Sequence, residues 1–191
     1  MRRFFCLILV SSLPAWAHAE VRTGVVGGNG GVPFSYSCGD GFVLRGVFAH
    51  TGSWVDGIEA VCAVASGKFA GVTKGTNERG DTGNRYYGGS GGGATNALCN
   101  KREAAWGLKA TSGMLTGHIR GVTRIELGCG SSSGNGDQLY GTRQIGGPDK
   151  PDATSSQLTC PRGTVATGIF GRAGKWLDQI GLICNDIHPA G

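Results

Sequence analysis

The sequence predicts an all-β domain built from three repeated units, and two observations lead to this prediction. The cysteine that opens each unit recurs at a fixed interval: Cys38, Cys99 and Cys160 are separated by 61 residues each time. The 37 glycines of the chain fall between short runs of β-branched and aromatic residues, without the every-third-residue period of collagen. A repeat of about sixty residues restricts the fold to assemblies of similar units, and the glycine pattern makes those units strands and turns.

The first and third copies align without a gap, from Cys38–Cys62 to Cys160–Cys184, and share ten of 25 positions. The middle copy closes at Cys129, so its two cysteines stand 30 instead of 24 residues apart and six residues are inserted. Because the units share a framework, a functional site built from that framework should recur. The positions shared by the first and third copies are the two cysteines and Gly41/Gly163, Val43/Val165, Gly46/Gly168, Phe48/Phe170, Gly52/Gly174, Trp54/Trp176, Asp56/Asp178 and Ile58/Ile180.

Residues 1–19 have the pattern of a signal peptide. Arg2 and Arg3 precede an apolar run, Phe4 to Leu13, and Ala17-His18-Ala19 forms a small-residue cleavage pattern. The apolar run is too short to span a bilayer, and no later segment approaches the necessary length. Cleavage near Ala19 predicts a secreted protein, extracellular or periplasmic. The remaining residues are expected to form a single domain, 20–191, with repeat units at about 24–66, 86–131 and 144–186.

In an oxidising compartment the six cysteines of the mature chain are expected to form disulfides. Six cysteines allow fifteen connectivities, and the repeat selects the one with a bridge in each unit: Cys38–Cys62, Cys99–Cys129 and Cys160–Cys184. No C-x-x-C occurs, and the mature histidines, His50, His118 and His188, stand at unrelated positions. The sequence therefore predicts no metal site and no cofactor, and His50 and His118 are expected to be exposed loop residues.

Composition and motifs also exclude other function classes. Without Arg2 and Arg3 the 18 basic residues fall to 16 against 13 acidic ones, and a net charge of about +3 is too small to indicate a nucleic-acid partner. Residues 130–134 match G-x-S-x-G, but no helix follows to form a nucleophile elbow. A glycosidase needs two carboxylates roughly 5–10 Å apart, whereas Asp56 and Asp178 belong to different units. No enzymatic activity is predicted.

Each unit is expected to contribute two long strands, and further strands near the glycine clusters should complete a sheet of about four strands per unit. Residues 97–106 have a helix-like composition, but Gly107 follows Cys99 at the distance at which Gly46 follows Cys38, so this segment is predicted to be strand. The polar segments 66–87 and 131–144 are predicted to be surface loops. The apolar runs that indicate the long strands are 42–48, 55–64, 164–170 and 177–184.

The most specific motif is Gly-x-Trp-x-Asp, which occurs at residues 52–56 and again at 174–178. A turn that starts at glycine can aim successive backbone N–H groups at one point, and a nearby carboxylate can accept two hydroxyl hydrogen bonds. Adjacent hydroxyls of a pyranose require this combination, and an aromatic side chain at the rim adds an apolar wall. The middle unit has lost the carboxylate, because Thr123 or Gly117 takes its place, depending on the cysteine from which positions are counted.

Together with the glycine cluster at 27–31, this turn resembles the jacalin-related lectins. That family has a β-prism fold, three four-stranded Greek-key sheets around a pseudo-three-fold axis. It holds sugar between a glycine-rich loop and a Gly-x-x-x-Asp turn. Vitelline membrane outer layer protein is a second, disulfide-linked β-prism that the chain resembles. Mannose-binding members often carry Asp directly after the motif glycine, where this chain has Ser53 and Lys175.

The resemblance implies a carbohydrate-binding protein whose partners are glycans or glycoconjugates. A third position, near Gly146-Gly147, would bind no sugar, because the middle unit lacks the aspartate. The implied sites pair Gly30 and Gly31 with Gly174, Lys175, Trp176 and Asp178, and the loop containing Gly89 and Gly91 with Gly52, Ser53, Trp54 and Asp56.

The alternative is a structural or protein-binding extracellular module in which these turns are only framework. In that interpretation the tryptophans are buried under the sheets and the aspartates bind their own backbone N–H groups. A β-trefoil is the competing three-fold fold, although it repeats at a shorter interval. Trp106 is expected in the core, and Arg172 and Lys175 are expected to be solvated surface charges.

Overall fold

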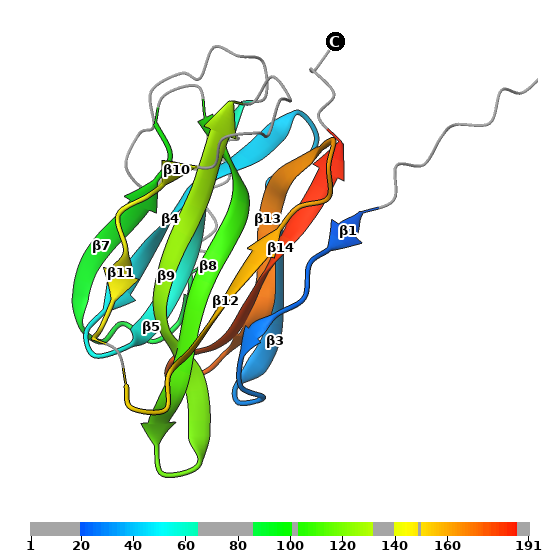
Figure 1. The fold of residues 1–191 in the computed structure, drawn as a ribbon. Coiled ribbons are helices and arrows are strands. Elements are labelled where there is room, and N and C mark those ends of the chain that lie inside the picture. Colours follow the sequence, from blue (N-terminus) through cyan, green and yellow to red (C-terminus); the bar gives the residue numbers. More distant parts are fainter. Residues whose placement is uncertain (1–19, 65–85, 101–102, 132–139, 149, 187–191) are drawn as a thin grey trace, which may run out of the picture.

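The computed structural model describes residues 20–64, 86–100, 103–131, 140–148 and 150–186, and this part of the chain is all β, with no helix (Figure 1). The predicted signal peptide, and most of the segments predicted as surface loops, lie outside the described residues. The strands are β1 (Val21–Arg22), β2 (Val26–Gly27), β3 (Val32–Ser37), β4 (Phe42–Thr51), β5 (Val55–Val64), β6 (Tyr87–Gly88), β7 (Gly93–Leu98), β8 (Glu103–Thr116), β9 (Ile119–Ser131), β10 (Tyr140–Gly141), β11 (Ile145–Gly146), β12 (Thr154–Thr159), β13 (Thr164–Ala173) and β14 (Leu177–Asp186).

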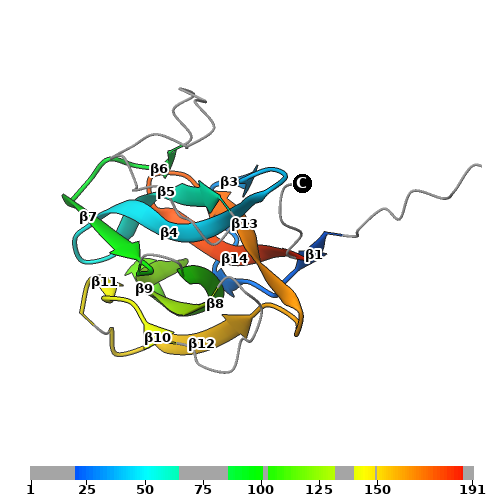
Figure 2. The ribbon, with the colours of Figure 1, turned by 90° about the horizontal axis from the view of Figure 1, so that it is seen from above.

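The strands form three antiparallel sheets around a common core (Figure 2). Sheet A has the order β1-β14-β13-β3, with β2 also paired to β14. Sheet B has the order β6-β5-β4-β7, and sheet C has the order β10-β9-β8-β12, with β11 also paired to β9. The prediction of an all-β domain with three pseudo-three-fold-related sheets is confirmed.

Each sheet combines strands from two repeat units, so the expectation of one sheet per unit is wrong. Strands β2 and β3 open the first unit but pair with β14 and β13 of the third unit. The hairpin β4–β5 of the first unit pairs with β6 and β7, which open the second. The first strands of a unit therefore cross to the neighbouring sheet before the hairpin begins.

Within 97–106, the described residues 97–98 and 103–106 are strand, as the repeat register predicted, whereas 99–100 are not in a strand. Strand β7 ends at Leu98 and β8 begins at Glu103. Trp106 is 4% exposed, which confirms its place in the interior. Tertiary pairing overrides the local helical propensity of this stretch, because both strands need partners in sheets B and C.

The core is built from equivalent side chains of the three hairpins. Alternate residues of each long strand point inward, as expected for antiparallel sheets with one solvated face. Nine equivalent side chains, three from each hairpin, are at most 1% exposed, and each contributes roughly 1.5–3 kcal/mol to stability by burial. The equivalent sets are Val47, Leu108 and Ile169; Val55, Val122 and Leu177; and Ile58, Ile125 and Ile180.

The three disulfides have the predicted connectivity, with Cα–Cα distances of 5.6, 5.5 and 5.7 Å. Cys38 directly follows β3 of sheet A and is bonded to Cys62 in β5 of sheet B. In the same way Cys99–Cys129 joins sheet B to sheet C, and Cys160–Cys184 joins sheet C to sheet A. Within the described chain the bridges therefore connect the three sheets pairwise into a closed ring.

The hairpin turns and the glycine-rich loops gather at one end of the domain. Strand β5 begins at Val55, beside its turn, and reaches Cys62 near its other end; β14 runs the same way from Leu177 to Cys184. The hairpin β8–β9 extends beyond the others at the lower end of the molecule in Figure 1. The candidate site residues lie at this end, away from the disulfides.

Candidate functional site

The glycine-rich loop after β2 lies against the carboxylate of Asp178, as the resemblance implied. A β-carbon at Gly31 would stand 2.5 Å from Asp178 Oδ2, and one at Gly30 would collide with Oδ1. On the other side of the carboxylate lies Gly174 of the turn, where a β-carbon would stand 3.7 Å from Oδ2. We call this arrangement of loop, turn and Asp178 site A.

Two features hold the loop of site A in place. Gly31 has φ +57°, a left-handed conformation that other residues adopt at a cost. Arg172 donates hydrogen bonds from Nε to the carbonyl of Gly30 (2.8 Å) and from Nη2 to that of Gly31 (2.7 Å). The expectation that Arg172 is a solvated surface charge is therefore wrong: its guanidinium positions the loop.

Site B repeats this geometry around Asp56. A β-carbon at Gly91 would stand 2.7 Å from Asp56 Oδ1, and Gly92, with φ +68°, lies against the backbone of Thr51. A β-carbon at Gly52 of the turn would stand 3.7 Å from the Cα of Gly92 and 4.0 Å from Asp56 Oδ2. The loop of the second unit and the turn of the first thus enclose one carboxylate.

Tyr86 and His50 support the loop of site B, and sequence analysis missed Tyr86 by assigning it to a surface loop. The Tyr86 hydroxyl donates to the carbonyl of Gly89 (2.9 Å) and accepts the N–H of His50 (3.2 Å). Burial raises the pKa of Tyr86 to about 12, so the hydroxyl keeps its proton. His50 lies in β4 with a buried Nδ1, so its assignment to an exposed loop is wrong, whereas His118 is exposed at the tip of β8–β9.

Both aspartates are buried, Asp56 being 8% and Asp178 3% exposed. Burial raises the pKa of each carboxyl above its ordinary value, because the charged form loses hydration. Nearby positive groups oppose the shift: His50 and Lys175 at Asp56, and Arg172 at Asp178. The N–H of Gly174, which donates to the carbonyl of Trp176 at 2.9 Å, also lowers the pKa of Asp178.

The tryptophans of the two motifs lie at the turns and touch each other. The ring centroids of Trp54 and Trp176 are 6.2 Å apart in an edge-to-face arrangement. Both side chains are half-buried, and an ammonium group lies over each ring. Lys150 Nζ is 4.4 Å from the centroid of Trp54, and Lys175 Nζ is 4.9 Å from that of Trp176.

The loops and turns interlock around the end of the domain. A β-carbon at Gly28, in the loop of site A, would collide with the carbonyl oxygen of Arg120 in the hairpin of sheet C. Equivalent glycines repeat this close approach in the other two loops, and no residue larger than glycine fits. The other two contacts are Gly89 against the carbonyl of Lys175, and Gly147 against that of Ser53.

The third position lacks both halves of a site. The N–H of Gly147 bonds the carbonyl of Thr123 at 3.0 Å, as Gly28 bonds that of Asp178, so Thr123 occupies the place of the aspartate. Of the two alternatives left by the sequence, this one is correct. Lys150 faces Gly113 as Gly31 faces Gly174, and so stands where the other loops have their left-handed glycine.

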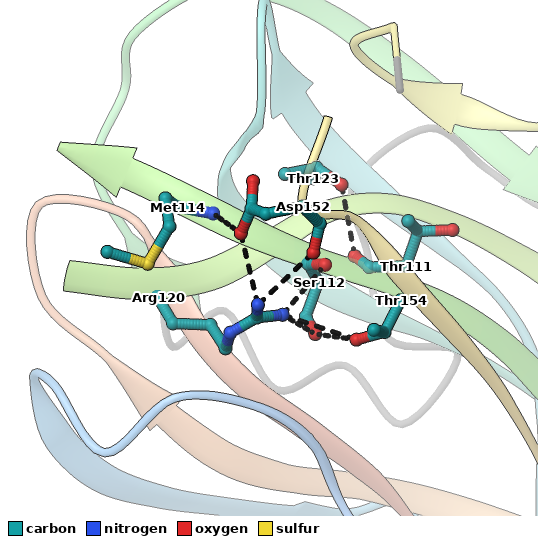
Figure 3. Close-up of polar contacts among 7 residues, drawn as sticks. All are labelled: Thr111, Ser112, Met114, Arg120, Thr123, Asp152 and Thr154. Atoms are coloured by element: carbon teal, nitrogen blue, oxygen red, sulfur yellow. Dashed lines mark hydrogen bonds and ion pairs between the residues drawn. The ribbon is translucent and has the colours of Figure 1, made fainter. Parts of the chain in front are cut away.

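A polar network fills this third position, and Figure 3 shows its members. Arg120, which stands where the other hairpins have Ser53 and Lys175, donates through Nη2 to Asp152 Oδ2 (3.0 Å) and through Nη1 to Ser112 Oγ (3.1 Å) and Thr154 Oγ1 (3.2 Å). The N–H of Met114 also donates to Asp152 (2.9 Å). The acidic group here comes from the loop side, and it is already paired.

Other candidate sites do not involve these residues. A shallow cavity of about 180 Å³ lies on the middle of sheet C, away from the turns, lined by residues such as Lys109, Glu126 and Gln157. Among the described residues no group of three His, Cys, Asp or Glu side chains is placed to hold a metal ion. No helix of the described chain is long and apolar enough to cross a membrane.

Several lectins are among the solved structures that this fold matches. Protein-family models and curated proteins yield no match to the chain. The Malaysian banana lectin is 20% identical with a TM-score of 0.58, covering 90% of this chain and 100% of the lectin. A mannose-binding jacalin-related lectin from Ananas comosus is 17% identical with a TM-score of 0.57, covering 88% and 99%.

The Calsepa lectin, solved in complex with a biantennary N-glycan, is 17% identical with a TM-score of 0.56, covering 92% of this chain and 100% of the lectin. At these identities the likeness establishes the fold. The chain has the β-prism fold of jacalin-related lectins, which confirms the fold that the resemblance implied.

Proposed function

We propose that this protein is a secreted carbohydrate-binding protein that holds sugar at site A and site B, without catalysis and without a cofactor. One observation carries the proposal: two buried carboxylates are each enclosed by a glycine-rich loop and a Gly-x-Trp-x-Asp turn. The glycines let loop backbone approach each carboxylate more closely than any residue with a side chain would allow. A fixed acidic acceptor next to backbone N–H donors is suited to the adjacent hydroxyls of a pyranose.

The fold supports this proposal because its solved neighbours are lectins, one of which is described as mannose-binding. The asymmetry of the three positions supports it as well. If the loops and turns were only framework, all three positions would be under the same packing constraint. Instead the two complete positions each place a carboxylate against glycine backbone, and the third contains an ion pair between Arg120 and Asp152.

The framework interpretation remains the second candidate, because both aspartates are buried and the N–H of Gly174 lies near Asp178. The two candidates differ in what an amide substitution changes. Asp178→Asn keeps the shape but places an NH₂ donor among hydroxyl groups. Losing a charge-assisted hydrogen bond of roughly 1.5–3 kcal/mol should weaken binding at site A about ten- to a hundred-fold.

A glycan array on the mature protein tests the proposal, followed by calorimetric titration of a recognised sugar into Asp178→Asn and Asp56→Asn. Asp40→Asn is the matched control, because Asp40 is exposed in the turn between β3 and β4 at the opposite end of the strands. With a monosaccharide as the ligand, we expect a stoichiometry of two for the parent chain, one for each site variant and two for the control. An array without signal, or intact binding with a lowered melting temperature in both site variants, would make the turns framework.

A further inference from the structure

Site A and site B share a wall. Lys175 belongs to the turn around Asp178, yet its carbonyl packs against Gly89 in the loop beside Asp56. The Lys175 ammonium also acts electrostatically on Asp56, whose pKa it lowers. The turn of sheet A therefore bounds both sites at once.

An aromatic bridge crosses this wall. Trp54 and Trp176, whose rings meet at 6.2 Å, each stand two residues before a site aspartate. Both rings are half-buried, so part of each remains on the surface between the two sites. Flat aromatic surface suits the apolar C–H face of a pyranose, and the lysines over the rings bring hydrogen-bond donors to the same strip.

The third position contributes to this strip instead of forming a site. Lys150, which replaces the left-handed glycine of that loop, directs its ammonium to the ring of Trp54. Thr123 and the Arg120–Asp152 pair close the position itself. Site A and site B remain, joined by the Trp54–Trp176 contact and by the approach of Gly89 to the carbonyl of Lys175.

We propose that site A and site B are the two subsites of one elongated site, which binds a single oligosaccharide across the Trp54–Trp176 bridge. This inference rests on the proposed function and specifies its ligand class. One sugar residue occupies each aspartate, and the segment between them lies on the tryptophans. Linking two sugars in one ligand makes the second binding event intramolecular, which raises affinity about 10²- to 10⁴-fold over a single sugar.

The first test compares mannose with a biantennary N-glycan by calorimetry. We expect two mannose molecules per chain but one N-glycan, bound at least about a hundred-fold more tightly than mannose. Light scattering should show a complex of one chain with one glycan, which excludes cross-linking of two chains. Two N-glycans per chain, or an N-glycan bound no more tightly than mannose, would overturn the elongated site.

The variant Asp56→Asn best distinguishes one elongated site from two independent sites, and Asp40→Asn is its matched control. In an elongated site the variant should lose about a hundred-fold in N-glycan affinity, down to the level of mannose. Independent sites predict a different result: half the stoichiometry, with the affinity of the remaining site unchanged. The control should behave as the parent chain does.

Three further variants probe the bridge, and each is checked for folding by its melting temperature. Trp54→Ala and Trp176→Ala should each lower N-glycan affinity about tenfold and mannose affinity less, and Trp54→Phe should restore most of the loss. Unchanged N-glycan affinity in both alanine variants would overturn the bridge. Absence of binding to either probe, together with an array without signal, would overturn the proposed function and this inference with it.

Discussion

Asp56 and Asp178 are buried to an extent that is rare for carboxylates, and glycine makes this possible. At each site a glycine places loop backbone against the carboxylate, where a side chain would collide with it: Gly30 and the left-handed Gly31 at Asp178, and Gly91 at Asp56. The carboxylates are therefore held rigidly by backbone, with a positive side chain nearby to support the ionised form.

Gly31→Ala tests the close approach at site A, and Gly117→Ala is its matched control. Both glycines have left-handed φ values, +57° and +50°, so alanine is conformationally strained at either position. Only at Gly31 would the new methyl group meet other atoms, 2.5 Å from Asp178 Oδ2, whereas the space beside Gly117 is open.

Gly117→Ala should cost about 1–2 kcal/mol of unfolding free energy and leave sugar affinity unchanged. Gly31→Ala should cost more and abolish binding at site A, measured by denaturant unfolding and by calorimetry. Equal costs in the two variants, with binding intact in both, would contradict the proposed role of the loop.

The raised pKa of Asp178 gives binding and stability opposite pH dependences. On acidification the carboxyl takes up its proton above its ordinary value of 3.8, so sugar affinity at site A should begin to fall above that pH. The effect on stability has the other sign. Because the ionised group is less favourable in the folded than in the unfolded chain, Asp178 lowers stability above its folded pKa, and protonation removes this penalty.

The measurement uses Asp56→Asn, which leaves site A alone, titrated with mannose from about pH 3 to 7. Unfolding free energies of the parent chain and Asp178→Asn over the same range give the second quantity. As the pH falls, the unfolding free energy of the parent chain should rise relative to that of Asp178→Asn. Affinity that persists unchanged below pH 3.8 would show that the ionised carboxylate is not needed.

At the scale of elements, the β8–β9 hairpin is the one that departs from the pattern. It has six inserted residues, and its Arg120 binds the loop before β12 through Asp152. The network joins the hairpin to this loop through charged side chains. It should therefore contribute to stability.

Arg120→Ala should lower the unfolding free energy by about 1–2 kcal/mol, because it removes several charge-assisted hydrogen bonds from a group that is one-third exposed. Arg162→Ala, at an exposed turn residue, should change it by less than about 0.5 kcal/mol. Thermal or urea unfolding of the two variants measures the difference. Equal values would show that the network adds nothing beyond a surface ion pair.

The elements that a single repeat contains were predictable from the sequence. The hairpins, the disulfide partners and the two aspartates are set by spacing within a unit, which the cysteine interval reveals. The environments of Arg172 and His50 were not predictable, because their partners lie about 140 and 36 residues away in the chain. The exchange of strands between sheets was also hidden, since the alternation of apolar residues is the same whichever sheet a strand joins.

For the whole molecule, the disulfide ring is the feature that joins the sheets covalently. Each bridge closes a loop of similar length, with sequence separations of 24, 30 and 24 residues. In the chain-entropy account, each should contribute about 3 kcal/mol by restricting the unfolded chain.

Replacing one cysteine pair at a time by alanine should therefore lower the unfolding free energy by similar amounts in all three variants. Denaturant unfolding under non-reducing conditions measures these values. A variant whose loss is far larger than the others would show that one bridge stabilises the native packing and not only the unfolded ensemble.

Sheet A contains both ends of the described chain, since β1, β2 and β3 pair with β13 and β14. During synthesis, all the strands of sheet B have been made once the chain reaches Leu98, and those of sheet C once it reaches Thr159. Strands β2 and β3 must wait for the last hairpin, ending at Asp186. Site B is thus encoded within residues 50–92, whereas site A joins Gly31 to Asp178. The geometry of site A is consequently complete only after Asp178 has been synthesised, whereas the loop and the turn of site B both precede the end of β7 and wait only for Lys175, which packs against Gly89.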